Sequence, residues 1–205
     1  KHKLPMAIGI ARAVSHLHAQ RPPVVHCDLK PDTILIDDGF NAKLADFGVS
    51  REVDMTKTME AVGTPLFQAP ELVRREQYDH AVDIWSFACV LECMWTHAQP
   101  YADVPDSSHE GANALVRAVA NEKLQPAVLG FLADVVRGCS AFIPDERNSF
   151  ARVLEQLTAP SLVVEATCVP AGPPRRESAP FGTQRGTCNS ITETTRRPGK
   201  PTASE

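Results

Sequence analysis

Hydrophobic residues are spaced along most of the chain as they are in helices. Over 5–19, Ile8, Ala11 and Val14 recur at intervals of three with polar residues between them, which is typical of an amphipathic helix. From Val82 to Trp95, eleven of the fourteen residues are apolar, so this segment is expected to form a central helix buried on nearly every side. Shorter helical patterns follow between proline or glycine breaks, and the predicted fold is therefore mainly α, with further helices at 112–121, 129–139 and 149–157.

A β-hairpin is predicted after the first helix. Two short apolar runs, 34–36 and 42–45, flank an Asp-Asp-Gly stretch, and these are turn-forming residues. If the hairpin were symmetric about residues 39–40, Thr33 would lie opposite Asp46. The hairpin would then bring the polar segment before its first strand next to the carboxylate that ends its second strand.

The composition changes near residue 158. Prolines, serines, threonines and arginines replace the apolar residues, and apolar periodicity stops at about Val164. We therefore expect one folded domain at 1–157 and a disordered Pro/Ser/Thr/Arg-rich tail at 158–205. The tail carries six basic residues against four glutamates, which is too weak an excess to indicate a nucleic-acid platform.

The remaining composition favours a soluble, cytoplasmic protein with no membrane span. No apolar run approaches the ~20 residues that a helix needs to cross a bilayer. The six cysteines form no CxxC pair, and several lie within apolar runs, so reduced thiols are expected rather than a metal site or disulfides. The chain opens with Lys1 at the start of a helical pattern, which suggests a fragment.

The candidate chemistry lies between the first helix and the hairpin. The stretch HCDLKPDT (26–33) contains the carboxylate of Asp28, the ammonium of Lys30 and the hydroxyl of Thr33. The hairpin adds a second carboxylate, that of Asp46. Carboxylates at one edge suit a hard cation such as Mg²⁺, which usually takes one or two protein oxygens and completes its shell with phosphates and water. Phosphoryl transfer uses this set of groups.

Several motifs resemble those of eukaryotic protein kinases. HCDLKPDTIL (26–35) resembles the catalytic loop, and Asp46-Phe47-Gly48 resembles the metal-binding Asp-Phe-Gly motif. Further matches follow in kinase order, and the resemblance covers residues 4–157: Gly-Thr-Pro (63–65) leading to Ala-Pro-Glu (69–71), Asp-Ile-Trp-Ser-Phe (83–87) and a late Arg147. The resemblance implies the helical C-terminal lobe of a serine/threonine protein kinase of the tyrosine-kinase-like type, an α+β fold whose small β-hairpin carries the catalytic edge.

The resemblance also implies roles for individual residues. Asp28 would orient the substrate hydroxyl and accept its proton, Lys30 would steady the γ-phosphate of ATP, and Asp46 would hold Mg²⁺. Lys30 and Thr64 mark kinases whose protein substrates accept phosphate on Ser or Thr. The structural roles it implies are His26 packing beneath Phe47, Glu71 pairing with Arg147, and Asp83 bracing the backbone of the catalytic loop.

The chain departs from the family pattern at three points. Cys27 replaces the arginine that binds the activation-loop phosphate in many kinases, a non-RD pattern, so phosphorylation at Thr56 or Thr58 in the activation segment is expected to act as a weaker switch. Thr33 replaces an asparagine that contacts a second Mg²⁺, and it would be a weak metal ligand. No Gly-rich loop or strand lysine precedes the catalytic loop, so an ATP-binding N-terminal lobe is expected as a partner in the complete protein.

Two functions remain open. The first is a protein serine/threonine kinase, and the second is a pseudokinase-like lobe that serves as a protein-binding scaffold. A thiol nucleophile at Cys27 activated by His26 is disfavoured, because adjacent residues on an extended chain point to opposite faces. His16 and His18 are expected to be surface residues, because i,i+2 positions on a helix do not face each other.

Overall fold

The computed structural model describes residues 2–52, 63–102, 104, 112–128 and 130–160. These residues form a mainly helical structure, as the sequence predicted, with two small antiparallel sheets, of which the sequence predicted only the hairpin. The helices are α1 (Lys3–His18), α2 (Pro70–Val73), α3 (Ala81–Thr96), α4 (Ala112–Ala120), α5 (Ala133–Cys139) and α6 (Phe150–Leu157). The strands are β1 (Val24–Val25), which pairs with β4 (Arg51–Glu52), and β2 (Ile34–Ile36), which pairs with β3 (Ala42–Leu44).

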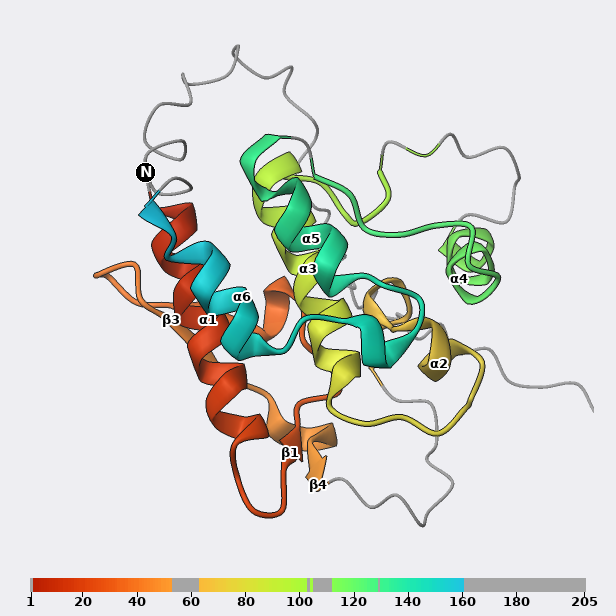
Figure 1. Cartoon of the computed structure of the whole chain (residues 1–205), viewed down its shortest axis with the longest axis horizontal. Helices are drawn as coiled ribbons and strands as arrows, with labels where there is room; N and C mark the ends of the chain where they lie inside the picture. Colours follow the sequence, from red (N-terminus) through yellow and green to blue (C-terminus); the bar gives the residue numbers. More distant parts are fainter. Residues whose placement is uncertain (1, 53–62, 103, 105–111, 129, 161–205) are drawn as a thin grey trace, which may run out of the picture. The chain divides into compact units, whose positions relative to one another are not determined.

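Helix α3 is the centre of the hydrophobic core, as predicted. Every residue from Ala81 to Glu92 is buried, and Trp85 and Phe87 are among the largest side chains that are fully buried. Helix α5 packs on α3, and α1 packs on both α3 and α6. Figure 1 shows α3 with α1 and α6 on one side and α2 and α4 on the other. The central helix therefore offers a rigid base on which the preceding loops can be held.

The bounds of helix α1 agree with the predicted range to within two residues, but the predicted exposure of one of its histidines is wrong. The buried face consists of Leu4, Ala7, Ile10, Ala11 and Val14. His16 is exposed, as expected. The expectation that His18 is a surface residue is wrong, because its side chain is only 10% exposed and contacts the carboxylate of Asp83 in α3.

The β2–β3 hairpin forms as predicted, but the predicted register is wrong by one residue. Ile34 pairs with Leu44, and Ile36 pairs with Ala42. The loop closes with the Phe40 amide donating to the Asp37 carbonyl at 2.9 Å, and Phe40 takes a left-handed φ of 61°. A turn followed by one left-handed residue forms a three-residue loop, and this loop shifts the pairing. Opposite Thr33 therefore lies Ala45, whose amide donates to the Thr33 carbonyl at 2.9 Å.

The C-terminal helices are confirmed, with one shortened. Helices α4 and α6 match their predicted ranges closely. Helix α6 begins after Ser149, whose hydroxyl accepts a hydrogen bond from the Arg152 amide at 3.3 Å. The predicted helix at 129–139 begins later, at Ala133. Gly130 has a φ of +80°, which an α-helix cannot accommodate, and a single 3₁₀ turn (Gly130–Leu132) precedes α5.

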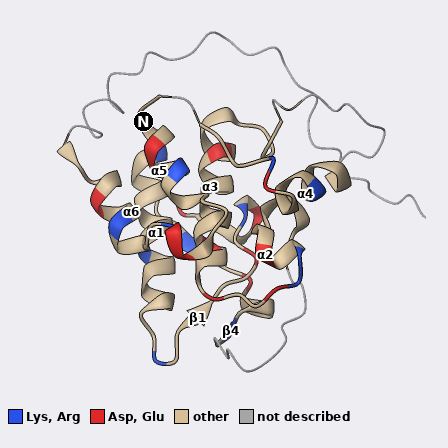
Figure 2. Ribbon diagram, turned by 45° about the vertical axis from the view of Figure 1, so that its right-hand side comes forward, with Lys and Arg blue, Asp and Glu red and all other residues tan. Residues whose placement is uncertain are grey.

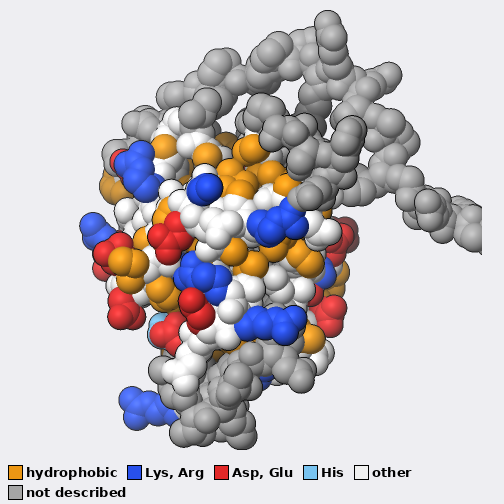
Figure 3. Space-filling model, turned by 90° about the vertical axis from the view of Figure 1, so that its right-hand side faces the viewer, with side chains coloured by type: hydrophobic (Ala, Val, Ile, Leu, Met, Phe, Trp, Pro, Cys, Tyr) orange, Lys and Arg blue, Asp and Glu red, His pale blue; other side chains and the backbone are white. Residues whose placement is uncertain are grey.

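Charges on the described surface are mixed in sign. Figure 2 shows basic and acidic residues interspersed on α5 and α6, where Arg137 pairs with Asp134 and Arg152 pairs with Glu155. Figure 3 shows the same mixture on the face turned to the viewer. The expectation that nucleic acid is not a partner stays a prediction.

Two other expectations can be compared with the described residues. None of their helices is long and apolar enough to cross a bilayer. Their cysteines, namely Cys27, Cys89, Cys93 and Cys139, are free thiols. The predicted tail at 158–205 lies almost wholly outside the described residues.

Candidate active site

The loop between β1 and β2 brings Asp28, Lys30 and Thr64 together. The Lys30 ammonium donates to one Asp28 carboxylate oxygen at 2.7 Å and to the Thr64 hydroxyl at 2.7 Å. The Thr64 amide and hydroxyl each donate to the other Asp28 oxygen at 2.8 Å. These bonds hold the carboxylate in one orientation from both sides. Thr64 is far from Asp28 in the sequence, so tertiary packing assembles this contact.

The backbone before Asp28 is held by a carboxylate from the central helix. Asp83 accepts the His26 amide at 2.8 Å on one oxygen and the Cys27 amide at 2.9 Å on the other. Cys27 takes a left-handed φ of 65°, which costs free energy for a residue with a side chain. Asp83, whose side chain is 1% exposed, therefore holds a strained backbone directly before Asp28.

His26 is fully buried and uses both ring nitrogens in local contacts. Its Nε2 lies 3.1 Å from the Ala45 carbonyl, and the Asp28 amide donates to Nδ1 at 3.4 Å. A neutral imidazole with its hydrogen on Nε2 satisfies both contacts. The ring also lies 5.3 Å from the Phe47 ring. Both ring nitrogens are thus engaged in contacts within the domain, so neither is available as a general base.

Thr33 is buried, and its hydroxyl is directed to the loop backbone. The oxygen lies 3.0 Å from the carbonyl oxygens of both Asp28 and Lys30, and it accepts the Lys30 amide at 3.2 Å. These contacts tie the start of β2 to the loop that carries Asp28. The one-residue shift in hairpin register also removes the pairing that was expected to place Thr33 opposite Asp46.

Asp46 follows β3 and is exposed. It takes a left-handed φ of 60°, a conformation that aspartate adopts more readily than most residues. Its carboxylate makes no hydrogen bond or ion pair with another described residue. Among these residues, no cluster of three or more His, Cys, Asp or Glu could hold a metal ion. Mg²⁺ in phosphoryl transfer usually needs only one or two protein carboxylates, so an accessible Asp46 carboxylate fits such an ion.

The Cys27 thiol is unsuited to nucleophilic chemistry. Burial raises its pKa to about 12, with a further increase from the negative charge of Asp83. A thiol with this pKa is almost wholly protonated at neutral pH, whereas the thiolate is the reactive form. The thiol-nucleophile alternative is therefore disfavoured by the structure as well as by the sequence.

Glu71 and Arg147 form a buried bidentate ion pair. The two guanidinium nitrogens donate to the two carboxylate oxygens at 2.6 and 2.8 Å, and both side chains are at most 3% exposed. Arg147 also donates to the carbonyls of Ala81 and Ala141 at 2.9 and 2.8 Å. The pair thus ties α2, which follows the Thr64 segment, to the start of α3 and to the loop before α6.

Gly63 is required where the Thr64 segment crosses the catalytic loop. Its φ is +98°, and a Cβ at this position would collide with the Cys27 carbonyl oxygen. The segment is held to α3 by the Ser86 hydroxyl, which donates to the Phe67 carbonyl at 2.7 Å. A side chain at residue 63 would push the backbone away from Asp28.

Replacing Gly63 with alanine is expected to lower the free energy of unfolding by about 2–4 kcal/mol, because the substitution adds backbone strain and a steric collision. Gly130→Ala is the matched control, since Gly130 has a φ of +80° but nothing within 4 Å of the added Cβ. Chemical denaturation of the two variants measures the difference. Equal losses in both would show that the contact with Cys27 does not matter.

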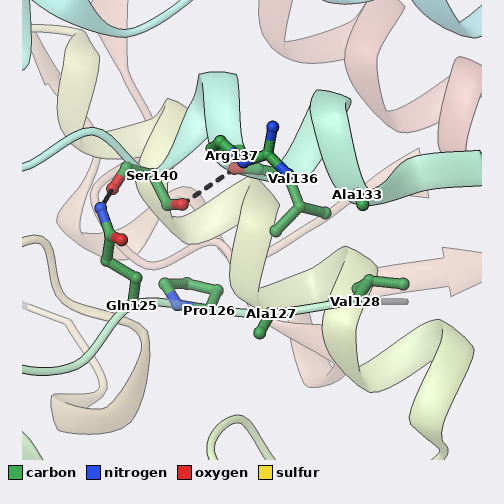
Figure 4. A pocket seen from close by; sticks show the side chains of 8 residues that line it. All are labelled: Gln125, Pro126, Ala127, Val128, Ala133, Val136, Arg137 and Ser140. Atoms are coloured by element: carbon green, nitrogen blue, oxygen red, sulfur yellow. Dashed lines mark hydrogen bonds between the residues drawn. The ribbon is translucent and has the colours of Figure 1, made fainter. Parts of the chain in front are cut away.

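The predicted activation-segment residues Thr56 and Thr58 lie outside the described residues. One cavity among the described residues lies apart from the site. A cavity of about 320 Å³ lies between α5 and the segment 125–128, and Figure 4 shows the Gln125 amide bonded to the Ser140 carbonyl at its edge. None of its lining residues belongs to the catalytic loop or to the Thr64 segment.

The described residues form a mainly helical fold with carboxylates near a hairpin, and comparison with known proteins identifies the family. Residues 4–157 match the family model described as the protein kinase domain. The chain therefore belongs to the protein kinase family.

Similar proteins include several serine/threonine kinases. A probable serine/threonine-protein kinase of Dictyostelium discoideum is 35% identical over 76% of this chain and 11% of its own length. The serine/threonine-protein kinase CTR1 of Arabidopsis thaliana is 32% identical over 77% and 19%. The dual specificity protein kinase shkB of Dictyostelium discoideum is 32% identical over 78% and 25%. The chain thus spans between about a tenth and a quarter of the length of these relatives.

Sequence reasoning missed two residues at this site. Gly63 was noted only as part of a motif, although a glycine directly before Thr64 is a signal for a close backbone approach. The contact of His18 with Asp83 had no such signal, because the two residues lie on different helices and 65 positions apart.

Proposed function

We propose that this chain is the catalytic C-terminal lobe of a protein kinase that transfers the γ-phosphate of ATP to Ser or Thr of a protein substrate. The observation that carries the proposal is the orientation of the Asp28 carboxylate by Lys30 and Thr64. Asp28 would orient the acceptor hydroxyl and take its proton. Lys30, already beside that carboxylate, would steady the transferred phosphate.

Asp46 is the residue proposed to hold Mg²⁺. The accessible carboxylate supports this role, and the bound ion would neutralise charge on the phosphates during transfer. Thr33 is a weaker candidate for a metal ligand, because its hydroxyl already bonds to the loop backbone. The hydrogen bond from the Cys27 amide to Asp83 holds the backbone next to Asp28, and the hydrogen bond from the Ala45 amide to the Thr33 carbonyl holds the backbone next to Asp46. These two bonds would keep the Asp28 and Asp46 backbones in place during transfer.

An ATP-binding lobe is proposed to cover the hairpin edge. Leu35, Ile36 and Phe40 of the hairpin are 45–57% exposed, and Phe47 next to Asp46 is 48% exposed. Large apolar side chains gathered at one edge are expected to be covered by another protein surface. The shortness of the chain relative to its kinase relatives is compatible with further domains in the complete protein.

Cys27 supports a non-RD mode of regulation for this proposed kinase. Its thiol is buried and protonated, so it cannot supply the positive charge that an arginine would offer to a phosphate. Phosphorylation at Thr56 or Thr58 is therefore proposed to have a weaker effect on activity than in kinases with that arginine.

The expected product of the two-lobed protein is phosphoserine or phosphothreonine, because Lys30 and Thr64, which by the family resemblance mark kinases of Ser and Thr, both hydrogen-bond the Asp28 carboxylate. The measurement is phosphoamino-acid analysis of a peptide library carrying Ser, Thr and Tyr acceptors. Asp46→Asn is the test of the metal role and should raise the Mg²⁺ concentration needed for half-maximal rate about tenfold or more. Asp38→Asn, an exposed carboxylate on the hairpin loop, is the control. Phosphotyrosine as the main product would contradict the acceptor assignment.

A scaffold is the second candidate function, favoured by one observation. Thr33 uses its hydroxyl to stabilise the loop, so a second metal ion would find a poorer ligand than an asparagine at this position. In a scaffold, Asp28 and Lys30 would be structural, and no transfer should occur above the background of Asp28→Asn. Absence of any transfer by the two-lobed protein, together with normal folding, would favour this function over the kinase.

A further inference from the structure

The number of metal ions that this site can hold depends on Thr33. In protein kinases, two Mg²⁺ ions are held by the aspartate of the Asp-Phe-Gly motif and by an asparagine of the catalytic loop. This chain has Asp46 at the first position and Thr33 at the second. Whether a second ion finds a ligand here is therefore decided by the contacts of the Thr33 hydroxyl.

The Thr33 hydroxyl is engaged by the backbone of its own loop. Its oxygen accepts the Lys30 amide at 3.2 Å, and its hydrogen is directed to the carbonyl oxygens of Asp28 and Lys30, each 3.0 Å away. A hydroxyl has one hydrogen and two lone pairs, so one lone pair remains. Thr33 is only 2% exposed, so a cation could reach that lone pair only by opening the loop and leaving buried backbone groups unpaired, which is costly.

The hairpin register separates Thr33 from Asp46. The residue opposite Thr33 is Ala45, whose amide donates to the Thr33 carbonyl at 2.9 Å. Asp46 lies beyond the last ladder pair, and with its left-handed φ of 60° it precedes the 3₁₀ turn Phe47–Val49. The two side chains that would share a second ion are therefore not a cross-strand pair.

Asp28 does not replace the missing ligand. One of its carboxylate oxygens accepts the Lys30 ammonium at 2.7 Å, and the other accepts the amide and the hydroxyl of Thr64 at 2.8 Å. The carboxylate is only 13% exposed, and the ammonium beside it would repel a second cation. Asp46 is the contrasting case, because its carboxylate is exposed and makes no hydrogen bond or ion pair with another described residue.

We propose that this chain holds a single Mg²⁺, at Asp46, and that Thr33 is a positioning residue of the catalytic loop rather than a metal ligand. The inference rests on the proposed kinase function for the identity of the ion. One carboxylate is sufficient, because Mg²⁺ completes its shell with phosphate oxygens and water. The residues present thus do not fit the two-ion pattern of the family, and the ion that arrives with ATP is the only one the site needs.

Two substitutions at residue 33 separate the roles of ligand and positioning residue. Thr33→Val removes the hydroxyl and keeps the branched shape, whereas Thr33→Asn supplies the side chain of the two-ion pattern. Thr158→Val is the matched control, because the Thr158 hydroxyl also donates to a backbone carbonyl, that of Leu154 at 2.7 Å, but does so at the end of α6. Asp46→Asn is the control for loss of the bound ion.

Amide hydrogen exchange of the 205-residue chain, followed by NMR, tests the positioning role without any metal. In Thr33→Val, the Lys30 amide loses its acceptor and is expected to exchange about tenfold faster, while Thr158→Val leaves its rate unchanged. Unchanged exchange of the Lys30 amide in Thr33→Val would overturn the proposal, because the hydroxyl would then be free to bind a metal ion.

The ion count is measured on the complete two-lobed protein. Mn²⁺, a paramagnetic substitute for Mg²⁺, is titrated in the presence of a non-hydrolysable ATP analogue and followed by electron paramagnetic resonance. One bound Mn²⁺ is expected in the wild type, in Thr158→Val and, with unchanged affinity, in Thr33→Val, and two are expected in Thr33→Asn. Two ions in the wild type, or a weaker ion in Thr33→Val, would overturn the proposal. One ion in Thr33→Asn would overturn the role given to residue 33.

The dependence of the transfer rate on Mg²⁺ is the last measurement. The wild-type rate should reach its maximum when all ATP is present as MgATP, and a tenfold excess of free Mg²⁺ should change it by less than about twofold. A rate that keeps rising with free Mg²⁺ would indicate a second activating ion and would contradict the proposal. If the protein binds one Mn²⁺ with the nucleotide but transfers no phosphate, the kinase function fails and the single-ion site stands. If it binds neither, both fail.

Discussion

Replacing Asp28 with asparagine is expected to lower the single-turnover rate of the two-lobed kinase by about 10²–10⁴-fold, which is the usual contribution of a general base. Asparagine cannot accept the proton of the substrate hydroxyl. It also turns one acceptor oxygen into a donor, and both Asp28 oxygens accept hydrogen bonds, from Lys30 and Thr64. Quenched-flow measurements with excess enzyme report the chemical step without interference from product release.

Asp32→Asn is the matched control for this measurement. Asp32 is an exposed aspartate four residues further along the same loop, so its substitution changes the net charge of the loop by the same amount. We expect Asp32→Asn to change the rate by less than about threefold. A rate for Asp28→Asn that equals that of the wild type would contradict the assignment of Asp28 as the base.

The largest effect on stability is expected at the buried ion pair. Arg147→Met should lower the free energy of unfolding by about 3–5 kcal/mol, because it leaves the Glu71 carboxylate buried without its partner. The loss corresponds to a fall in melting temperature on the order of 10 °C for a domain of this size. Calorimetry or chemical denaturation of the 205-residue chain measures it without any need for kinase activity.

An exposed ion pair in the same domain provides the comparison. Arg152 bonds Glu155 at 2.9 Å, similar to the Arg147 distances, but both side chains are more than 60% exposed. Surface pairs contribute at most about 1 kcal/mol, so Arg152→Met should change stability little. Similar losses for Arg147→Met and Arg152→Met would mean that burial does not determine the cost, and our account of the pair would be wrong.

Much of the fold followed from local patterns. The period of apolar residues was sufficient to locate α1, α4 and α6, and the near-continuous apolar run identified α3 as the central helix. These elements are predictable because their signal lies in residues three or four positions apart. Much of the candidate site could also be predicted from the sequence, since Asp28, Lys30 and Thr33 occur within six residues and the motifs around them resemble those of a known family.

The hairpin register was decided by tertiary structure. A symmetric loop was a reasonable expectation from Asp-Asp-Gly, because glycine is the residue that most readily takes a left-handed conformation. In the structure, Phe40 takes it instead, and its ring stacks on that of His2 at 3.8 Å. A contact with the start of α1 thus accompanies a backbone conformation that local preference would not assign to phenylalanine.

By itself, the sequence determined which segments are helical, which loop carries the candidate site residues and which family the chain resembles, because these depend on neighbours along the chain. Only the tertiary structure decided how that loop is held. Asp28 meets Thr64 across 36 positions, and His18 meets Asp83 across 65. Such contacts depend on how α1, α3 and the Thr64 segment pack together. The pattern of apolar residues within one segment does not determine where the other segments lie.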